Sequence, residues 1–183
     1  MVKKKIHRAY RKSKYVVYRQ TIVNPSDHFW TFIGAFIGIA FLGYLQGTQF
    51  GETDNVLLIG SFGATSVLIF GVTNSPLAQP RNLIFGHLIS AIIGVSIYKL
   101  IPDNMWLSSA LAVSLSIVVM QVTKTLHPPG GATALIANIG SEKIKSLGFG
   151  YIFSPVLSGV LILFMIAVIV NNIPKNRNYP YKK

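Results

Sequence analysis

Hydrophobic residues gather in five long runs separated by short polar links. Each run has about 17–21 residues, enough as an α-helix to cover the roughly 30 Å hydrocarbon core of a bilayer. The chain is 51% hydrophobic and 12% charged, with a mean hydropathy of +0.50, which is typical of a membrane protein. The five runs cover residues 30–46, 55–72, 83–100, 106–122 and 150–170.

A sixth apolar segment, residues 129–140, is shorter and begins beside two prolines. A helix of this length rises about 18 Å, a little over half of the core. Residues 123–128 would climb to it from the inner face in extended form, because six extended residues span up to about 20 Å. We therefore predict a broken crossing whose helical half begins near the middle of the membrane.

Positive charge gathers at the two ends of the chain, which carries 17 Lys and Arg against 5 Asp and Glu. Cytoplasmic segments of membrane proteins carry such excess, and basic tails lie against anionic headgroups. We predict a basic cytoplasmic arm (1–23), a transmembrane domain (24–173) and a basic cytoplasmic tail (174–183). Six crossings of an inner membrane place both termini on the cytoplasmic side. No nucleic-acid partner is expected.

A short internal repeat divides the transmembrane domain into two halves. The Gly-Ala-Thr triplet at residues 63–65 recurs at residues 131–133, an offset of 68. Each triplet lies in the middle segment of a three-segment half, 30–101 or 104–171, so the second half is inverted relative to the first. Inverted repeats are typical of secondary transporters, with the site at the midplane. The predicted fold is an all-α polytopic membrane protein made of two inverted three-helix repeats.

The broken segment supplies the first candidate binding site. Pro128 precedes Pro129, which suits the first position of a helix. The free N–H groups of Gly130, Gly131 and Ala132 would then point toward the membrane centre. A helix N-terminus with bare backbone attracts an anion.

Side chains around this helix start extend the predicted site. Lys124 and His127 add positive charge or donors on the approach, and Thr133 adds a hydroxyl group. His127 would also make transport sensitive to pH, because imidazole titrates near neutrality.

The first half offers hydroxyl groups to the same site. Ser61 and Thr65 are four residues apart and share a helix face with Gly63 between them. Small residues in membrane helices also serve close packing, so packing is the alternative for these positions.

Three further polar residues are secondary candidates. Arg81 and Asn82 follow the proline-rich link "SPLAQP", where Arg81 also fits a topology or headgroup role. His87 lies within the third segment, where a packed, hydrogen-bonded histidine is the alternative to a ligand-binding one.

The sign of the intramembrane charge favours an anion. Cation pathways use Asp or Glu within the membrane, and no acid falls inside a predicted span. The chain has no cysteine and none of the common hydrolase, metalloprotease or nucleotide-binding motifs. We therefore expect no enzyme activity, no cofactor and no metal.

Three stretches in this order resemble the HPP family of integral membrane proteins: "SFGATSVLIFG", "SPLAQPRNLIFGHLIS" and "HPPGGATALIANIG". The resemblance covers about residues 24–173. Gly130 departs from the commoner HPP-A-G-A form, which we expect to be a mild change. Plant chloroplast and cyanobacterial members are associated with nitrite transport, so the resemblance implies a transporter of a small anion.

The predicted function is transport of a small inorganic anion, nitrite first, through a midplane site. An anion channel with the same site is one alternative, and a non-transporting scaffold or lipid-binding protein is another. A short chain encloses little pore area by itself, so we expect a homo-oligomer.

Overall fold

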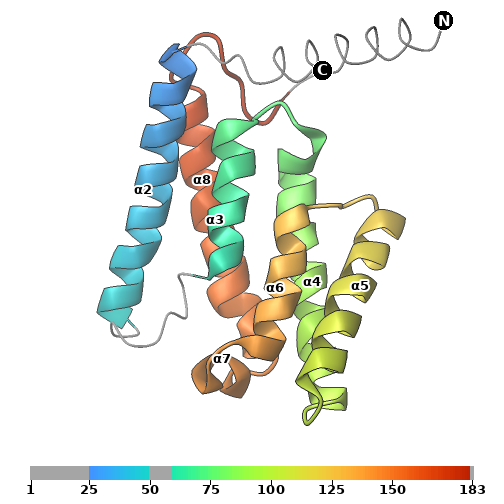
Figure 1. Ribbon diagram of the computed structural model, residues 1–183. Helices are drawn as coiled ribbons and strands as arrows, with labels where there is room; N and C mark the ends of the chain where they lie inside the picture. The colour runs from blue at the N-terminus through green and yellow to red at the C-terminus, as the bar shows by residue number, and fades with distance from the viewer. Residues whose placement is uncertain (1–24, 50–58, 182–183) are drawn as a thin grey trace, which may run out of the picture.

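The computed structural model describes residues 25–49 and 59–181, and every regular element in these ranges is a helix (Figure 1). The all-α prediction is thereby confirmed. The predicted basic arm and the first residues of the predicted second segment lie outside the described residues. The helices are α2 (Pro25–Gln49), α3 (Gly60–Ser66), α4 (Pro80–Leu100), α5 (Met105–Val122), α6 (Pro128–Ile139), α7 (Glu142–Ser146) and α8 (Ser158–Asn171), with the shorter turns η1 (Val67–Gly71), η2 (Pro76–Ala78) and η3 (Ile152–Leu157).

Four of the described helices are long and apolar enough to cross a membrane, which makes this a membrane protein with several apolar helices. They are Pro25–Thr48, Pro80–Leu100, Met105–Val122 and Ile152–Asn171. The predicted second span is shorter than expected, since its helix covers only Gly60–Gly71. Ile59 before it is extended, with φ −77° and ψ 141°, so the helix starts at Gly60.

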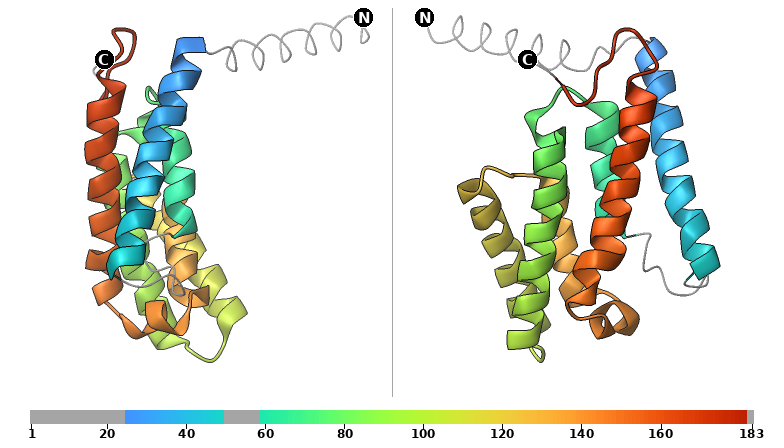
Figure 2. Two further views of the ribbon diagram at one scale, coloured as in Figure 1. Left: turned by 90° about the vertical axis from the view of Figure 1, so that its left-hand side faces the viewer. Right: turned by 180° about the vertical axis from the view of Figure 1, so that it is seen from behind.

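The four candidate spans and the two short helices run in alternating directions along the chain (Figure 1). In that view α2 descends, α3 ascends, α4 descends, α5 ascends, α6 descends and α8 ascends. Helix α4 packs against α5 and α6, α2 packs against α8, and α3 packs against α6. The start of α2 and the C-terminal residues therefore lie at the same end of the bundle (Figure 2).

The helix at the double proline is short, as predicted. His127 before it is extended, and the two prolines occupy the first two helical positions, where a missing N–H costs least. The 12 residues of α6 rise about 18 Å. The lead-in differs from the expected climb, because residues 123–127 run sideways from the end of α5 to the start of α6 (Figure 1).

The two short helices match in length and place. Gly60–Gly71 and Pro128–Ile139 start 68 residues apart and end 68 residues apart, the offset of the Gly-Ala-Thr repeat. They run in opposite directions and pack against each other near their starts (Figure 1). The two short helices therefore share the 68-residue offset of the Gly-Ala-Thr triplets.

Residues 172–181, here called the C-terminal strap, fold back over one end of the bundle (Figure 1). Tyr179 is buried within it and donates its hydroxyl to the Ala78 carbonyl at 2.6 Å. Burial raises the pKa of Tyr179, so the hydroxyl remains a proton donor. The segment predicted as a basic tail is therefore anchored to the bundle by buried Tyr179 and half-buried Arg177, while Lys175 and Asn176 are exposed.

Arg177 joins the strap to three helix ends. Its Nε forms a 2.9 Å salt bridge with Asp27, and Nη2 donates to the Asp27 carbonyl and to Thr31 Oγ1. Nη1 donates to the Phe70 carbonyl and to Asn171 Oδ1, both at 3.3 Å. A cation suits this place, because the last carbonyls of a helix lack internal partners.

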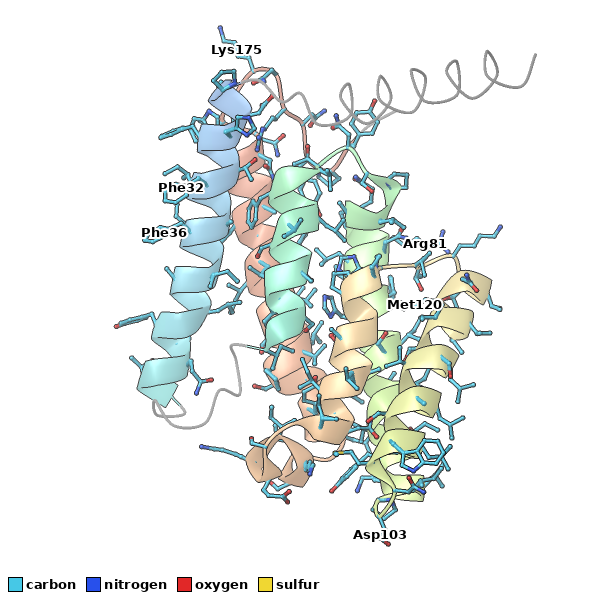
Figure 3. The ribbon with its side chains drawn as sticks, viewed as in Figure 1. Phe32, Phe36, Arg81, Asp103, Met120 and Lys175 are labelled. Atoms are coloured by element: carbon cyan, nitrogen blue, oxygen red, sulfur yellow. The ribbon has the colours of Figure 1, made fainter. Side chains whose placement is uncertain are left out.

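Replacing Arg177 with alanine should destabilise the bundle. The change removes the salt bridge to Asp27, and the side chains of the pair are only 7% and 20% exposed. We expect the free energy of unfolding to fall by about 2–3 kcal/mol. Thermal unfolding in detergent measures the loss, with Lys175→Ala as the control, since Lys175 projects away from the bundle (Figure 3). Equal stability of the two variants would contradict the role given to Arg177.

Close helix packing generates a second prediction. An added Cβ at Gly94 on α4 would lie 2.7 Å from the Ala134 carbonyl oxygen and 2.9 Å from Ala134 Cα, whereas one at Gly63 meets nothing within 4 Å. Gly94→Ala should therefore cost about 1–3 kcal/mol, because backbone atoms of α6 cannot move aside cheaply. Gly63→Ala should unfold at the wild-type temperature. The same melting temperature for both variants would show that α4 and α6 are not in this contact.

Candidate functional site

Four polar side chains meet where the short helices cross α4. Thr65 comes from α3, His87 from α4, His127 from the residue before α6, and Thr133 from α6; all four are fully buried. Thr65 Oγ1 lies 2.8 Å from His87 Nε2 and 3.2 Å from His127 Nε2. His87 Nδ1 lies 2.7 Å from Thr133 Oγ1. We call these residues the His–Thr cluster.

Backbone and aromatic neighbours fix the cluster in place. His127 Nδ1 is 2.8 Å from the Leu77 carbonyl of η2, and Tyr151 donates its hydroxyl to the Thr133 carbonyl at 3.0 Å. The two imidazole rings are 4.9 Å apart, and Phe62 packs edge-on to His87 at 5.9 Å. Sequence reasoning did not identify Leu77 or Tyr151, because neither position has a recognisable motif.

The repeated triplets place their threonines at equivalent points. Thr65 and Thr133 both contact His87, one at each ring nitrogen. The preceding residues turn outward: Gly63 and Ala64 are exposed, and the glycine and alanine of residues 131–132 line a groove. In each short helix the triplet therefore directs its hydroxyl inward and its small residues outward, which places Gly63 away from the cluster.

The start of α6 differs from the expected anion cradle. Neither Pro128 nor Pro129 has an N–H group, and the Gly130 N–H already donates to the His127 carbonyl at 2.8 Å. Gly130 is buried against α4, where an added Cβ would lie 2.9 Å from the Gly86 carbonyl oxygen. Gly130 therefore serves close packing, and an alanine there would not be the mild change that the resemblance suggested.

The surface beside this helix start is apolar. A cavity of about 500 Å³ lies between α5 and α6, and Pro128 and Gly131 face it. Its lining is Val113, Ile117, Met120, Leu126, Pro128, Gly131, Ala132 and Leu135. An anion is therefore better served by the buried hydroxyl and imidazole groups than by this groove.

Arg81 and Asn82 hold the link between α5 and α6. Arg81 Nη2 donates to the Thr123 carbonyl at 3.0 Å, and Asn82 Nδ2 donates to the Leu126 carbonyl at 2.8 Å. Lys124 lies on this link with a left-handed φ of 56° and an exposed side chain. Arg81 and Asn82 therefore position His127 from outside the cluster. Lys124 places its positive charge on the surface of the link.

Ser61 adds an unsatisfied polar atom near the cluster. Its side chain is fully buried, and its Oγ has no hydrogen-bond partner among the described residues. Because Ser61 and Thr65 are one turn apart on α3, they share the face that packs inward. A buried hydroxyl without a partner costs free energy, so this atom is a natural contact for a bound polar solute.

A second cavity, of about 690 Å³, lies under the C-terminal strap. Its wall is about half polar, with Asp27 and Arg177 beside the link that follows η1. No group of three metal-binding side chains occurs among the described residues.

Comparison with known proteins agrees with this architecture. A family model described as "HPP, transmembrane region" matches residues 20–180. Two proteins of Dictyostelium discoideum, each named only as a transmembrane protein, are 49% identical over 154 residues, which is 82% of this chain. The matched region is 54% of one relative and 49% of the other, so the chain spans about half of their length.

No solved structure matches the chain. The family match covers the short helices, the double proline and all four residues of the His–Thr cluster. The chain therefore belongs to the HPP family of transmembrane proteins.

Proposed function

We propose that this protein transports a small inorganic anion across a membrane, with nitrite as the first substrate to test. The observation that carries the proposal is the His–Thr cluster, which places two imidazoles and two hydroxyls at the meeting point of two short helices. Polar groups at this depth are costly and usually mark a solute pathway. Interrupted helices meeting near the midplane are a recurrent transporter site.

The charge of the described spans favours an anion. Asp27 is the acid within these spans, and it lies in the first turn of α2 in a salt bridge with Arg177. The cluster contains no carboxylate to attract a cation. Hydroxyl donors and imidazole suit a small anion such as nitrite, nitrate, formate or chloride. The resemblance to nitrite-associated family members sets the order of testing.

The proposed topology has six crossings as two inverted halves, with both termini on the cytoplasmic side of an inner membrane. The alternating helix directions and the shared offset of 68 residues support this arrangement. The basic residues at the two ends favour the cytoplasmic side. A homo-oligomer remains part of the proposal, because much of α2 and α5 is exposed.

The buried state of the cluster favours a transporter over a permanently open channel. All four side chains have no exposed surface, so the solute enters only after the helices move. Alternating access predicts uptake that saturates with anion concentration, whereas an open pore gives a linear dependence.

Removal of the Thr133 hydroxyl tests the proposed site. In proteoliposomes supplied with nitrite, nitrate, formate or chloride, Thr133→Val should reduce uptake about tenfold, the effect of losing one hydrogen bond to a bound anion. Thr133→Ser should restore uptake, since it keeps the hydroxyl. Ser114→Ala is the matched control, because Ser114 is exposed on α5 and bonds its own helix backbone. Failure of all four anions to move would contradict the proposed function.

Lys124→Ala should affect capture of the anion and leave the maximal rate unchanged. Lys124 is exposed on the link before α6, so its attraction acts through water and is screened by salt. We expect the half-saturating anion concentration to rise about twofold to threefold at low ionic strength, and to return to the wild-type value near 0.15 M salt. A fall in the maximal rate at both salt concentrations would instead place Lys124 in the transport path.

A further inference from the structure

The hydrogen bonds of the His–Thr cluster have a direction that one backbone group determines. The Leu77 carbonyl can only accept, so His127 Nδ1 must carry a proton and donate to it. In a neutral imidazole the other ring nitrogen is then an acceptor. His127 Nε2 therefore accepts a hydrogen bond from Thr65 Oγ1 at 3.2 Å.

The rest of the chain of bonds follows from counting protons. Thr65 has a single hydroxyl proton, which it gives to His127, so its oxygen accepts from His87 Nε2–H at 2.8 Å. His87 Nδ1 is then an acceptor, and the Thr133 hydroxyl donates to it at 2.7 Å. In the neutral cluster each donor and each ring nitrogen is satisfied in one continuous line from Thr133 to Leu77.

The same atoms also accommodate one extra proton. When His127 is an imidazolium, its Nε2–H donates to Thr65, and the Thr65 hydroxyl turns to donate to His87 Nε2. His87 then carries its proton on Nδ1 and donates to Thr133, whose own hydroxyl proton faces the Pro129 carbonyl at 3.4 Å. The cluster thus satisfies its hydrogen bonds with or without the extra proton.

A proton can pass between these two states by short transfers. A proton delivered to the Thr133 oxygen displaces the hydroxyl proton of Thr133 onto His87 Nδ1. His87 then releases its Nε2 proton to Thr65, and Thr65 passes its own hydroxyl proton to His127 Nε2. One proton enters, one positive charge appears on His127, and no covalent bond other than N–H and O–H changes.

The positive charge on His127 has no charged hydrogen-bond partner among the described residues, so a bound anion can balance it. The neighbours of the cluster include Phe62 from α3, which packs edge-on to His87, the Leu77 carbonyl from η2, which bonds His127, and Tyr151 from the segment before α8, which bonds Thr133. Tyr151 is the titratable one of these, and its hydroxyl already donates to the Thr133 carbonyl. Among the described residues, the hydrogen bonds of the two imidazoles include no carboxylate, ammonium or guanidinium.

From these observations we propose that Thr133, His87, Thr65 and His127 form a proton relay that couples movement of the anion to movement of one proton. This inference rests on the proposed function of anion transport. A cation buried without a partner is strongly unfavourable, as is a buried anion, so each promotes binding of the other. Binding linkage of this kind is reciprocal. The protein then acts as an electroneutral symporter of a proton and a monovalent anion.

The test uses full-length protein in proteoliposomes that contain a pH-sensitive dye, with protein-free vesicles subtracted and membrane potential clamped by potassium and valinomycin. The probe is whichever of nitrite, nitrate, formate and chloride moves fastest. Anion entry should acidify the lumen with about one proton per anion, and an outer acid gradient of one pH unit should support about tenfold accumulation.

Thr65→Val separates the relay from the anion site. The isosteric change removes the hydroxyl between the two imidazoles, so gradient-driven uptake and lumen acidification should fall at least about tenfold. Exchange of internal for external anion moves no net proton, so Thr65→Val should reduce exchange clearly less than it reduces gradient-driven uptake. Thr65→Ser keeps the hydroxyl and should behave like the wild type, which controls for folding.

Three outcomes decide the matter. Anion entry without lumen acidification in the wild type overturns the relay and leaves the transport function intact. A Thr65→Val variant that keeps both activities, or loses uptake and exchange by the same factor, also overturns the relay. Absence of uptake and exchange for all four anions contradicts the proposed transport function itself, and proton coupling falls with it.

Discussion

The hydroxyl of Thr65, bonded to both His87 Nε2 and His127 Nε2, is the contact on which the arrangement of the bundle depends. It joins α3, α4 and the start of α6, three elements that meet in the interior of the molecule. Inside a membrane protein an unpaired imidazole nitrogen costs several kcal/mol, on the order of other buried polar groups. The helices must therefore meet in a register that satisfies these atoms, and the glycines at the crossings let them approach closely enough.

Each of the two short helices has an end within the bundle, where its backbone groups need partners. Backbone at membrane depth is tolerated only when protein or a wet cavity surrounds it, so a helix that starts partway needs neighbours on every side. At the end of the helix Gly60–Gly71, Arg177 of the C-terminal strap donates to the Phe70 carbonyl. At the start of α6, the two prolines have no N–H groups that would need partners. Each triplet then directs its threonine toward the shared histidine.

Much of this arrangement could be read from the sequence, and the missing parts have identifiable causes. The lengths of the hydrophobic runs predict the long helices, and the double proline predicts the start of α6 to within one residue. The triplet gave Thr65 and Thr133, yet it also suggested Gly63, because spacing alone does not reveal which face of a short helix points inward. The sequence makes His87 only a secondary candidate, because its partners are 22 and 46 positions away in the chain. The sequence predicts only a basic tail at residues 174–183, because the burial of Tyr179 and the partners of Arg177 depend on tertiary contacts.

The central claim is that the His–Thr cluster binds the transported anion. The most direct measurement is a crystal structure of the protein soaked in bromide, with the anion located by anomalous scattering. The account predicts bromide inside the bundle, within about 3.5 Å of the hydroxyl oxygen of Thr133 or Thr65. Bromide confined to Lys124, Arg81 or the strap cavity, with none at the cluster, would contradict it.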